Sequence, residues 1–319
     1  MNPLNKLIAP KLPAAAIGLE SKSASVVHLE RRRREGFSLR RAATVALSES
    51  VLVPGFDEIN ITDPQELAHA LEEAVIGAGL GRQRKWSVTL PEAATRTVIL
   101  HLESAPGSRA ELEEVLRWKT ERNFGAPFEE LRVSREKLQT DAQGRERYLA
   151  VGVRESVLAE YESVLASLGW RAGLIVPRNV GESRWLLNGS APAAQGDALL
   201  ISSHKEGFTV ILTRAAKPLV VRSVLCEEED RDDELYRLLL FYRDRVTSAE
   251  EEMEARGIGR LMVLGEGFDK NHVSQLIKET LGYELRPLSA ADVGLQLPPG
   301  ELAFDEIAAP AGLASLAWR

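Results

Sequence analysis

The chain has few of the residues that build disulfides, metal sites and membrane spans. Its 319 residues include a single cysteine, Cys226, which excludes an internal disulfide framework and a cysteine-rich metal site. The five histidines are far apart in the sequence, so their spacing predicts no metal site. No run of about 18 apolar residues occurs, and prolines at positions 3, 10 and 13 interrupt the N-terminal segment. We therefore expect a cytoplasmic protein with neither a membrane span nor a signal peptide.

An excess of positive charge is also lacking. The 40 basic and 47 acidic residues give a formal net charge of -7, whereas a dedicated nucleic-acid-binding protein usually carries a net basic face. We therefore expect no nucleic acid among the partners. The local exception is the run from Arg31 to Arg34, which we interpret as the solvated tip of a β-hairpin or as an electrostatic contact for anionic lipid or an acidic partner.

A β-hairpin opens the chain. Apolar residues 14–19 predict its first strand and residues 25–30 its return strand. Gly18, Ser21 and Ser23 suit a turn whose backbone N–H groups approach an anion. Lys22, in the middle of this turn, adds a positive charge but hinders close approach of the backbone. The segment therefore predicts either a phosphate-holding turn or an ordinary solvated hairpin.

The remaining pattern divides this chain of 44% hydrophobic residues into more than one packed unit. Asp63 and Pro64 predict a helix start. Residues 86–168 read as strand, strand, helix, strand, strand, helix, which is typical of a self-contained α+β subdomain. Residues 188–196 have the composition of a linker. The strand pattern after them repeats the opening of the chain, and this repetition suggests an internal duplication.

Two further segments contain candidate functional residues. Trp118 and Phe124 lie at helical spacing, which indicates either core packing or a groove that receives a partner peptide. The buried-type strand 260–264 runs into a Gly265-Glu266-Gly267 turn, where glycine lets the backbone pass close to a ligand. The Ser202-Ser203-His204 segment lacks the Gly-x-Ser-x-Gly context of a nucleophile, so we expect no catalytic residues.

The chain contains an ordered series of short segments that no single motif explains. They are Gly18-Leu19-Glu20, Asn60-Ile61-Thr62-Asp63-Pro64, Leu116-Arg117-Trp118-Lys119, Pro127-Phe128-Glu129-Glu130, Arg154-Glu155, Leu240-Phe241-Tyr242-Arg243, Gly265-Glu266-Gly267 and Ala311-Gly312-Leu313-Ala314. Taken together, the series resembles the PilM-like proteins, the actin-like proteins of type IV pilus assembly, which are related in fold to FtsA, sugar kinases and heat-shock ATPases. The resemblance covers nearly the whole chain.

The resemblance implies an α/β protein with the actin-like, ribonuclease H-like two-lobe fold and an inserted α+β subdomain of the FtsA type. The implied divisions are residues 1–85 for the first part of the first lobe, 86–168 for the inserted subdomain, 169–195 for the rest of the first lobe and the linker, 196–300 for the second lobe, and 301–319 for a C-terminal helix that closes on the first lobe.

The resemblance also implies a nucleotide cleft, for which the chain departs from the family pattern. Family members typically have Asp-Ile-Gly in the first turn, where this chain has Glu20-Ser21-Lys22. The corresponding element of the second lobe falls near Ser202-Ser203-His204 and lacks the carboxylate that helps to hold Mg²⁺. We therefore expect binding of ATP with Mg²⁺ to be weak or lost. The candidate nucleotide contacts are Gly18, Ser21, Lys22, Ser23, Gly265 and Gly267.

The implied function is a scaffold of an inner-membrane platform for a type IV pilus or a related secretion system. Its partner would be the cytoplasmic N-terminal peptide of a PilN-like membrane protein, bound near the junction of the first lobe and the insert, with Trp118 and Phe124 as candidate contacts. Such a protein would lie at the inner face of the inner membrane and associate with the membrane indirectly. It could also self-associate.

Two other functions fit the same fold. An actin-fold ATPase or a sugar-kinase-like enzyme would need an aspartate in both phosphate turns, and both turns lack one. An FtsA-like filament former would need a C-terminal amphipathic helix as a membrane anchor, and residues 314–319 do not have that pattern.

Overall fold

The opening hairpin forms the centre of the first sheet in the computed structural model, which describes residues 11–32, 36–104, 106–141, 144–187, 196–246, 257–300 and 302–318. Ser21 and Lys22 form its two-residue turn, and Glu20 pairs with Ser23. The sheet has six strands in the order β13-β3-β2-β1-β4-β8. Their bounds are β1 (Ala15–Glu20), β2 (Ser23–Arg31), β3 (Phe37–Ala46), β4 (Lys85–Leu90), β8 (Arg171–Pro177) and β13 (Leu295–Gln296).

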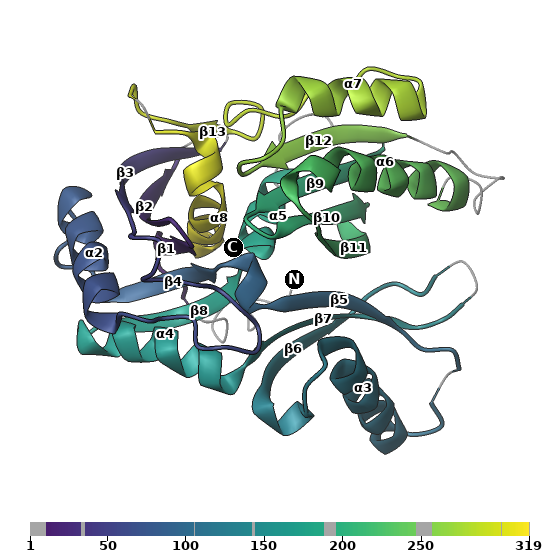
Figure 1. The fold of residues 1–319 in the computed structure, drawn as a ribbon, viewed down its shortest axis with the longest axis horizontal. Helices are drawn as coiled ribbons and strands as arrows, with labels where there is room; N and C mark the ends of the chain where they lie inside the picture. The colour runs from purple at the N-terminus through teal and green to yellow at the C-terminus, as the bar shows by residue number, and fades with distance from the viewer. Residues whose placement is uncertain are drawn as a thin grey trace.

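Helices cover both faces of this sheet, which explains why β1 and β4 are buried on both sides. On one face lie α2 (Pro64–Gly77) and α4 (Glu155–Ser167); on the other lie α5 (Arg178–Leu187) and α8 (Phe304–Ala314) (Figure 1). Helix α2 begins as predicted, with Pro64 as its first residue. The Asp63 carboxylate caps it by accepting from the backbone N–H groups of Gln65 and Glu66.

The second lobe repeats the strand connections of the first. Its sheet has the order β11-β10-β9-β12, and β12 runs parallel to β9 as β4 runs parallel to β1. The predicted internal duplication is therefore confirmed in topology. The elements are β9 (Asp197–His204), β10 (Gly207–Arg214), β11 (Lys217–Leu225), β12 (Ile258–Leu264), α6 (Arg231–Phe241), α7 (Lys270–Leu281), the 3₁₀ turn Glu228–Asp230 and the π-helical turn Tyr242–Val246.

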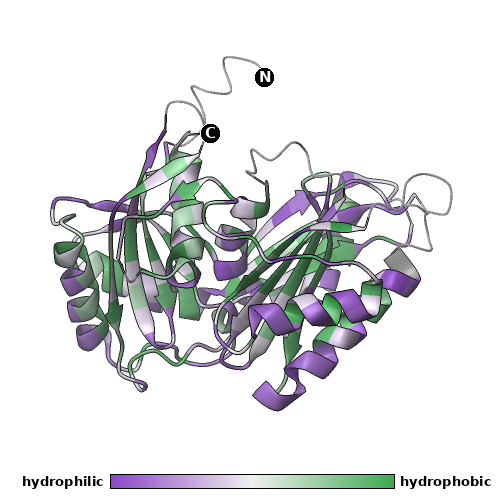
Figure 2. Cartoon of the chain, turned by 90° about the horizontal axis from the view of Figure 1, so that it is seen from above, coloured by the Kyte–Doolittle hydropathy of each residue, from purple (hydrophilic) through white to green (hydrophobic). Residues whose placement is uncertain are grey.

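The two lobes share one hydrophobic core. Helices α5 and α8 lie between the two sheets, and their apolar side chains pack with Ala16 and Val27 from the first sheet and with Leu200 and Met262 from the second. Figure 2 shows hydrophobic residues concentrated in the strands and these central helices, whereas the outer helices expose hydrophilic residues.

The inserted subdomain is smaller than the predicted segment 86–168. It contains a three-stranded antiparallel sheet of β5 (Arg96–His101), β7 (Arg147–Arg154) and β6 (Leu131–Lys137), covered by α3 (Arg109–Phe124). Strand β4 pairs instead with β1 and β8, and α4 packs in the core of the first lobe through Val157 and Tyr161. The insert therefore extends from about β5 to β7. Two 3₁₀ turns, Glu92–Ala94 and Phe128–Glu130, flank its strands.

The C-terminal part returns to the first lobe earlier than the predicted boundary at residue 300. Leu295 of β13 pairs with Phe37 of β3, so this short strand belongs to the first sheet. Helix α8 then packs against β1 and β2, as expected for a C-terminal helix that closes on the first lobe.

Some sequence predictions fall outside the described residues. They include linker residues 188–195 and, in the arginine run, Arg33 and Arg34. Arg31 and Arg32 are described and exposed. Among the described helices, none combines the length and apolar composition needed to cross a bilayer.

Candidate functional site

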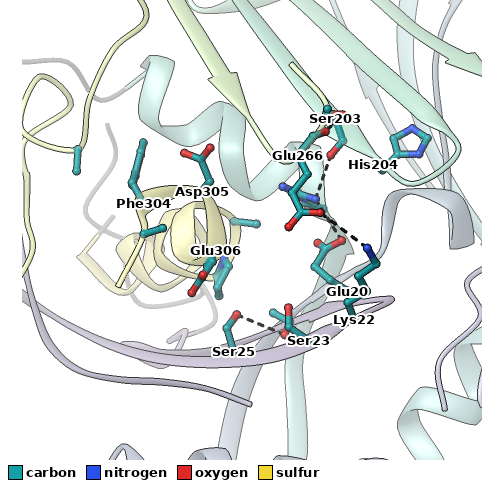
Figure 3. A pocket seen from close by; sticks show the side chains of 18 of the residues that line it. Glu20, Lys22, Ser23, Ser25, Ser203, His204, Glu266, Phe304, Asp305 and Glu306 are labelled. Carbon is teal, nitrogen blue, oxygen red and sulfur yellow. Dashed lines mark hydrogen bonds and ion pairs between the residues drawn. The ribbon is translucent and has the colours of Figure 1, made fainter. Parts of the chain in front are cut away.

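A cleft of about 1040 Å³ lies between the two lobes. Turns from both sheets line one end, and the start of α8 lines the other (Figure 3). The structure brings all the candidate nucleotide contacts to this cleft: Gly18, Ser21, Lys22, Ser23, Gly265 and Gly267. Their role in holding a nucleotide stays a prediction.

The end of β1 places a carboxylate at the cleft. Glu20 forms an ion pair with Arg178, in which Oε2 lies 3.2 Å from Nη1. Burial raises the pKa of Glu20 to about 7; the Arg178 charge opposes this shift and the nearby Glu182 carboxylate adds to it. In the turn itself, Lys22 Nζ lies 3.9 Å from Glu266 Oε2 of the second lobe, and both side chains are exposed.

Gly18 lies within β1, where protein atoms occupy the space beside its α-carbon. A Cβ at this position would lie 2.7 Å from Ser25 Oγ and 2.9 Å from Pro310 Cγ of α8. The absence of a side chain at Gly18 therefore permits α8 to pack closely on the strand.

Arg178, the first residue of α5, connects the two lobes. Its Nε donates to Glu182 Oε1, one helical turn along, at 2.6 Å, and its Nη1 donates to the backbone oxygen of Ser203 in β9 at 3.3 Å. With Glu20 as its other partner, the guanidinium links the end of β1 to the end of β9. The side chain is only 8% exposed.

Glu92 makes a second buried connection between the lobes. Its Oε1 accepts from Asn179 Nδ2 at 2.5 Å and from Thr209 Oγ1, on β10 of the second lobe, at 3.0 Å. Burial, together with the nearby Glu182 carboxylate, raises the pKa of Glu92 to about 7. The Glu92 carboxyl group is therefore protonated below about pH 7.

The β9–β10 turn surrounds a second buried arginine, Arg231, the first residue of α6. Its Nη2 donates to the backbone oxygens of His204 and Lys205 at 2.9 and 3.3 Å. Its Nη1 donates to Ser203 Oγ and to the backbone oxygen of Glu266, each at 3.1 Å. One guanidinium therefore joins the β9–β10 turn to the turn after β12.

His204 lies beside both arginines. Neither ring nitrogen has a hydrogen-bond partner among the described residues. Burial, together with the Arg178 and Arg231 charges, lowers the pKa of His204 to about 4. The imidazole is therefore neutral at physiological pH.

The glycines of the turn after β12 accommodate these groups. Gly265 and Gly267 have φ of +86° and +96°, a region that side chains disfavour. A Cβ at Gly265 would lie 2.3 Å from the Ser203 backbone oxygen, and one at Gly267 would lie 1.4 Å from Arg231 Nη1. The space that glycine leaves here is filled by the protein's own atoms.

The opposite end of the cleft is more apolar and has its own ion pair. Phe304, Asp305 and Glu306 point from the start of α8 (Figure 3), and Lys270 Nζ of α7 lies 2.8 Å from Asp305 Oδ1. The apolar lining residues at this end are Leu288, Ala290, Leu295, Leu297 and Phe304.

Sequence reasoning missed the buried charges Glu92, Arg178, Glu182 and Arg231. The available signals were an arginine directly after the apolar strand 174–177 and an Arg178–Glu182 pair at i, i+4 spacing. Neither signal indicates burial. Within the described part of the chain, no group of three or more His, Cys, Asp or Glu residues is placed to hold a metal ion.

The structure separates the two candidate partner contacts. Phe124 is buried in the core of the insert and packs edge-on against Phe56, with ring centroids 6.2 Å apart. Core packing therefore accounts for Phe124. Trp118 is 53% exposed, with the cationic groups of Lys119 and Arg122 at 5.8 and 5.5 Å from its ring centroid, so it is accessible to a partner.

Comparisons with known proteins identify the fold. No protein-family model matches the chain, and no curated protein matches it. A chain of the structure described as the PilM-PilN type IV pilus biogenesis complex is similar over 97% of this chain and 100% of its own length, with a TM-score of 0.75 and 19% identity. A protein of unknown function from Bacteroides thetaiotaomicron, described as having an actin-like ATPase fold, is similar over 97% of this chain and 98% of its own, with a TM-score of 0.50 and 12% identity. The chain therefore has the actin-like ATPase fold.

Proposed function

We propose that this protein is an assembly protein of a type IV pilus or a related inner-membrane platform. It binds the cytoplasmic N-terminal segment of a PilN-like membrane protein and lies at the inner face of the membrane through that partner. The observation that carries this proposal is the likeness to PilM, solved together with PilN, over the full length of that chain.

The junction between the first lobe and the insert is the proposed binding place. Ile59, in the loop before α2, lies at this junction and is 72% exposed. Most large apolar side chains of a folded domain are buried instead. Arg154, at the end of β7, holds this loop to the insert through Asp57, with Nε to Oδ1 at 2.7 Å, and through Glu130, with Nη1 to Oε2 at 2.5 Å. An apolar residue of the partner segment would pack on Ile59.

We further propose that the cleft is a degenerate nucleotide site, because the residues at its turn end do not suit Mg-ATP. Lys22 stands where the family has glycine, and the end of β9 lines the cleft with Ser203 and His204 instead of a carboxylate to hold Mg²⁺. Glu20, the one carboxylate at the expected position, is paired with Arg178. No reaction step through ATP follows from such a site.

An ATP-using enzyme of the same fold is the alternative. The cavity volume of about 1040 Å³ favours it, since clefts of this size accommodate cofactors. Measurable Mg-ATP hydrolysis that is lost in a Lys22 variant would support the enzyme in place of the assembly protein.

Titration with a tail peptide tests the proposed function. The probe is a peptide of the cytoplasmic N-terminal segment of a PilN-like membrane protein from the same organism. We expect saturable binding that Ile59→Ser weakens about 10-fold, because burial of an apolar side chain contributes about 1.5 kcal/mol or more. Ile76→Ser is the matched control: Ile76 is also 72% exposed, but lies on α2, away from the insert (Figure 1). Absence of binding, or equal weakening by both substitutions, would refute the proposed function or the proposed place.

A further inference from the structure

The β9–β10 turn directs backbone oxygens at two arginines that line the cleft. The Ser203 oxygen accepts from Arg178, and the next two oxygens, of His204 and Lys205, accept from Arg231. A phosphate-binding turn has the opposite polarity, because it is successive backbone N–H groups that form a concavity for an anion. This turn is therefore arranged around a cation.

The protein supplies that cation itself. The Arg231 residue is 5% exposed, and its guanidinium donates to four oxygens, two of them from Ser203 Oγ and the Glu266 backbone. No carboxylate among the described residues forms an ion pair with it. The oxygen dipoles of the two turns therefore compensate its charge, and loss of Arg231 would leave those oxygens without a donor.

Arg178 extends the connection to the first lobe. Its contact with Glu20 reaches the end of β1 at 3.2 Å, while its contact with Ser203 reaches the end of β9 at 3.3 Å. In an ATP-driven cleft, phosphate groups and Mg²⁺ occupy the space between such turns. Here one guanidinium joins them, and a second rigidifies the partner turn.

We propose that Arg178 takes the place of a ligand as the cross-link between the end of β1 and the β9–β10 turn, and that Arg231 holds the β9–β10 turn in position for it, so that the two lobes stay joined at the cleft without nucleotide. This inference rests on the degenerate cleft of the proposed function and adds how the two lobes are joined at that cleft. Gly265 and Gly267 support it, since a Cβ at either position would collide with the atoms of this cross-link.

Thermal unfolding of the full chain tests the contribution of Arg231. We expect Arg231→Ala to lower the melting temperature by roughly 5 °C and Arg231→Lys to lower it less, because lysine keeps the charge but cannot reach four oxygens. Arg237→Ala is the control: Arg237 lies on the same helix, is 68% exposed and pairs with Glu234. We expect about 20 mM guanidinium to restore part of the loss in Arg231→Ala and none in the control, with tetramethylammonium ineffective in both. Equal melting temperatures for the alanine variants at positions 231 and 237 would overturn the proposal.

Hydrogen exchange of the wild-type protein needs no variant and tests the same proposal if Arg231→Ala fails to fold. We expect the amides of residues 203–207 and 264–268 to exchange at the same rate with and without about 2 mM Mg-ATP. Protection of these segments by Mg-ATP would overturn the proposal. Failure of the tail peptide to bind would instead refute the assembly function and would leave the melting and exchange results as the test of the arginine cross-link.

Discussion

At the scale of single residues, the cleft is defined by charges that have lost contact with water. Arg178, Glu182, Glu92 and Arg231 are each less than 9% exposed, and each has partners that a substitution would leave unsatisfied. Buried charges of this kind are costly unless they are paired or hydrogen-bonded. Substitution of these groups, or of residues packed against them, should therefore change the stability of the protein measurably.

The raised pKa of Glu92 should make the stability of the protein depend on pH. Its pKa is about 7 in the folded protein, against an ordinary value of 4.5, so the folded state holds the proton more tightly than the unfolded chain does. Its contribution to the free energy of unfolding is present in full below pH 4.5 and is lost as the pH rises to about 7. We expect Glu92→Gln to flatten this dependence and, at pH 8, to stabilise the protein by up to about 3 kcal/mol. Denaturant unfolding at pH 5 and pH 8 measures it, with exposed Glu162→Gln as control; an unchanged pH profile in Glu92→Gln would contradict the assignment.

A side chain at position 267 should destabilise the protein more than the positive φ alone explains, because it would collide with Arg231. Gly267→Ala combines a φ of +96° with a Cβ 1.4 Å from Arg231 Nη1, whereas Gly282→Ala has a φ of +82° and no atom within 4 Å. We expect costs in unfolding free energy of about 3 kcal/mol and about 1 kcal/mol respectively. In an Arg231→Ala background the excess cost of Gly267→Ala should disappear; equal costs in the wild type would show that Arg231 is not packed against this turn.

At the scale of elements, local patterns predicted which segments are strands or helices better than they predicted where those segments pack. The first hairpin, the Asp63 cap and the repeated meander follow from short-range periodicity and turn chemistry. Strand β4 and helix α4 were assigned to the insert, yet they join the first lobe. Apolar periodicity shows that a face is buried, but not against which sheet. In the same way, Trp118 and Phe124 have similar local patterns and opposite exposure.

The side chain of Asn60 holds the loop before α2 in place through hydrogen bonds. Its buried side chain donates to the backbone oxygens of Gly55 and Glu58 at 2.7 and 2.8 Å and accepts from Tyr161 of α4 at 2.9 Å. We expect Asn60→Ala to lower the free energy of unfolding by about 2 kcal/mol and to speed hydrogen exchange in residues 55–60. Asn123→Ala on α3 is the surface control. Because the loop carries Ile59, tail-peptide binding should weaken as well; unchanged exchange in residues 55–60 would contradict this role.

At the scale of the whole molecule, the structure combines an actin-like fold with direct contacts between its two lobes. The apolar core that α5 and α8 share with both sheets holds the lobes at one side, and the contacts of Arg178 with Glu20 and Ser203 join them at the cleft. The fold class followed from the ordered series of segments. The buried arginines did not, because a sequence does not show which charged residues lose contact with water. We therefore expect a protein that presents a binding surface at the junction with the insert and does not cycle with nucleotide.

Isothermal titration of the full chain with the partner's cytoplasmic peptide, with and without about 2 mM Mg-ATP, tests this central claim most directly. We predict saturable binding with the same dissociation constant in both conditions. Absence of saturable binding would contradict the assembly function, and binding that appears only with Mg-ATP would contradict lobes that Arg178 joins without nucleotide.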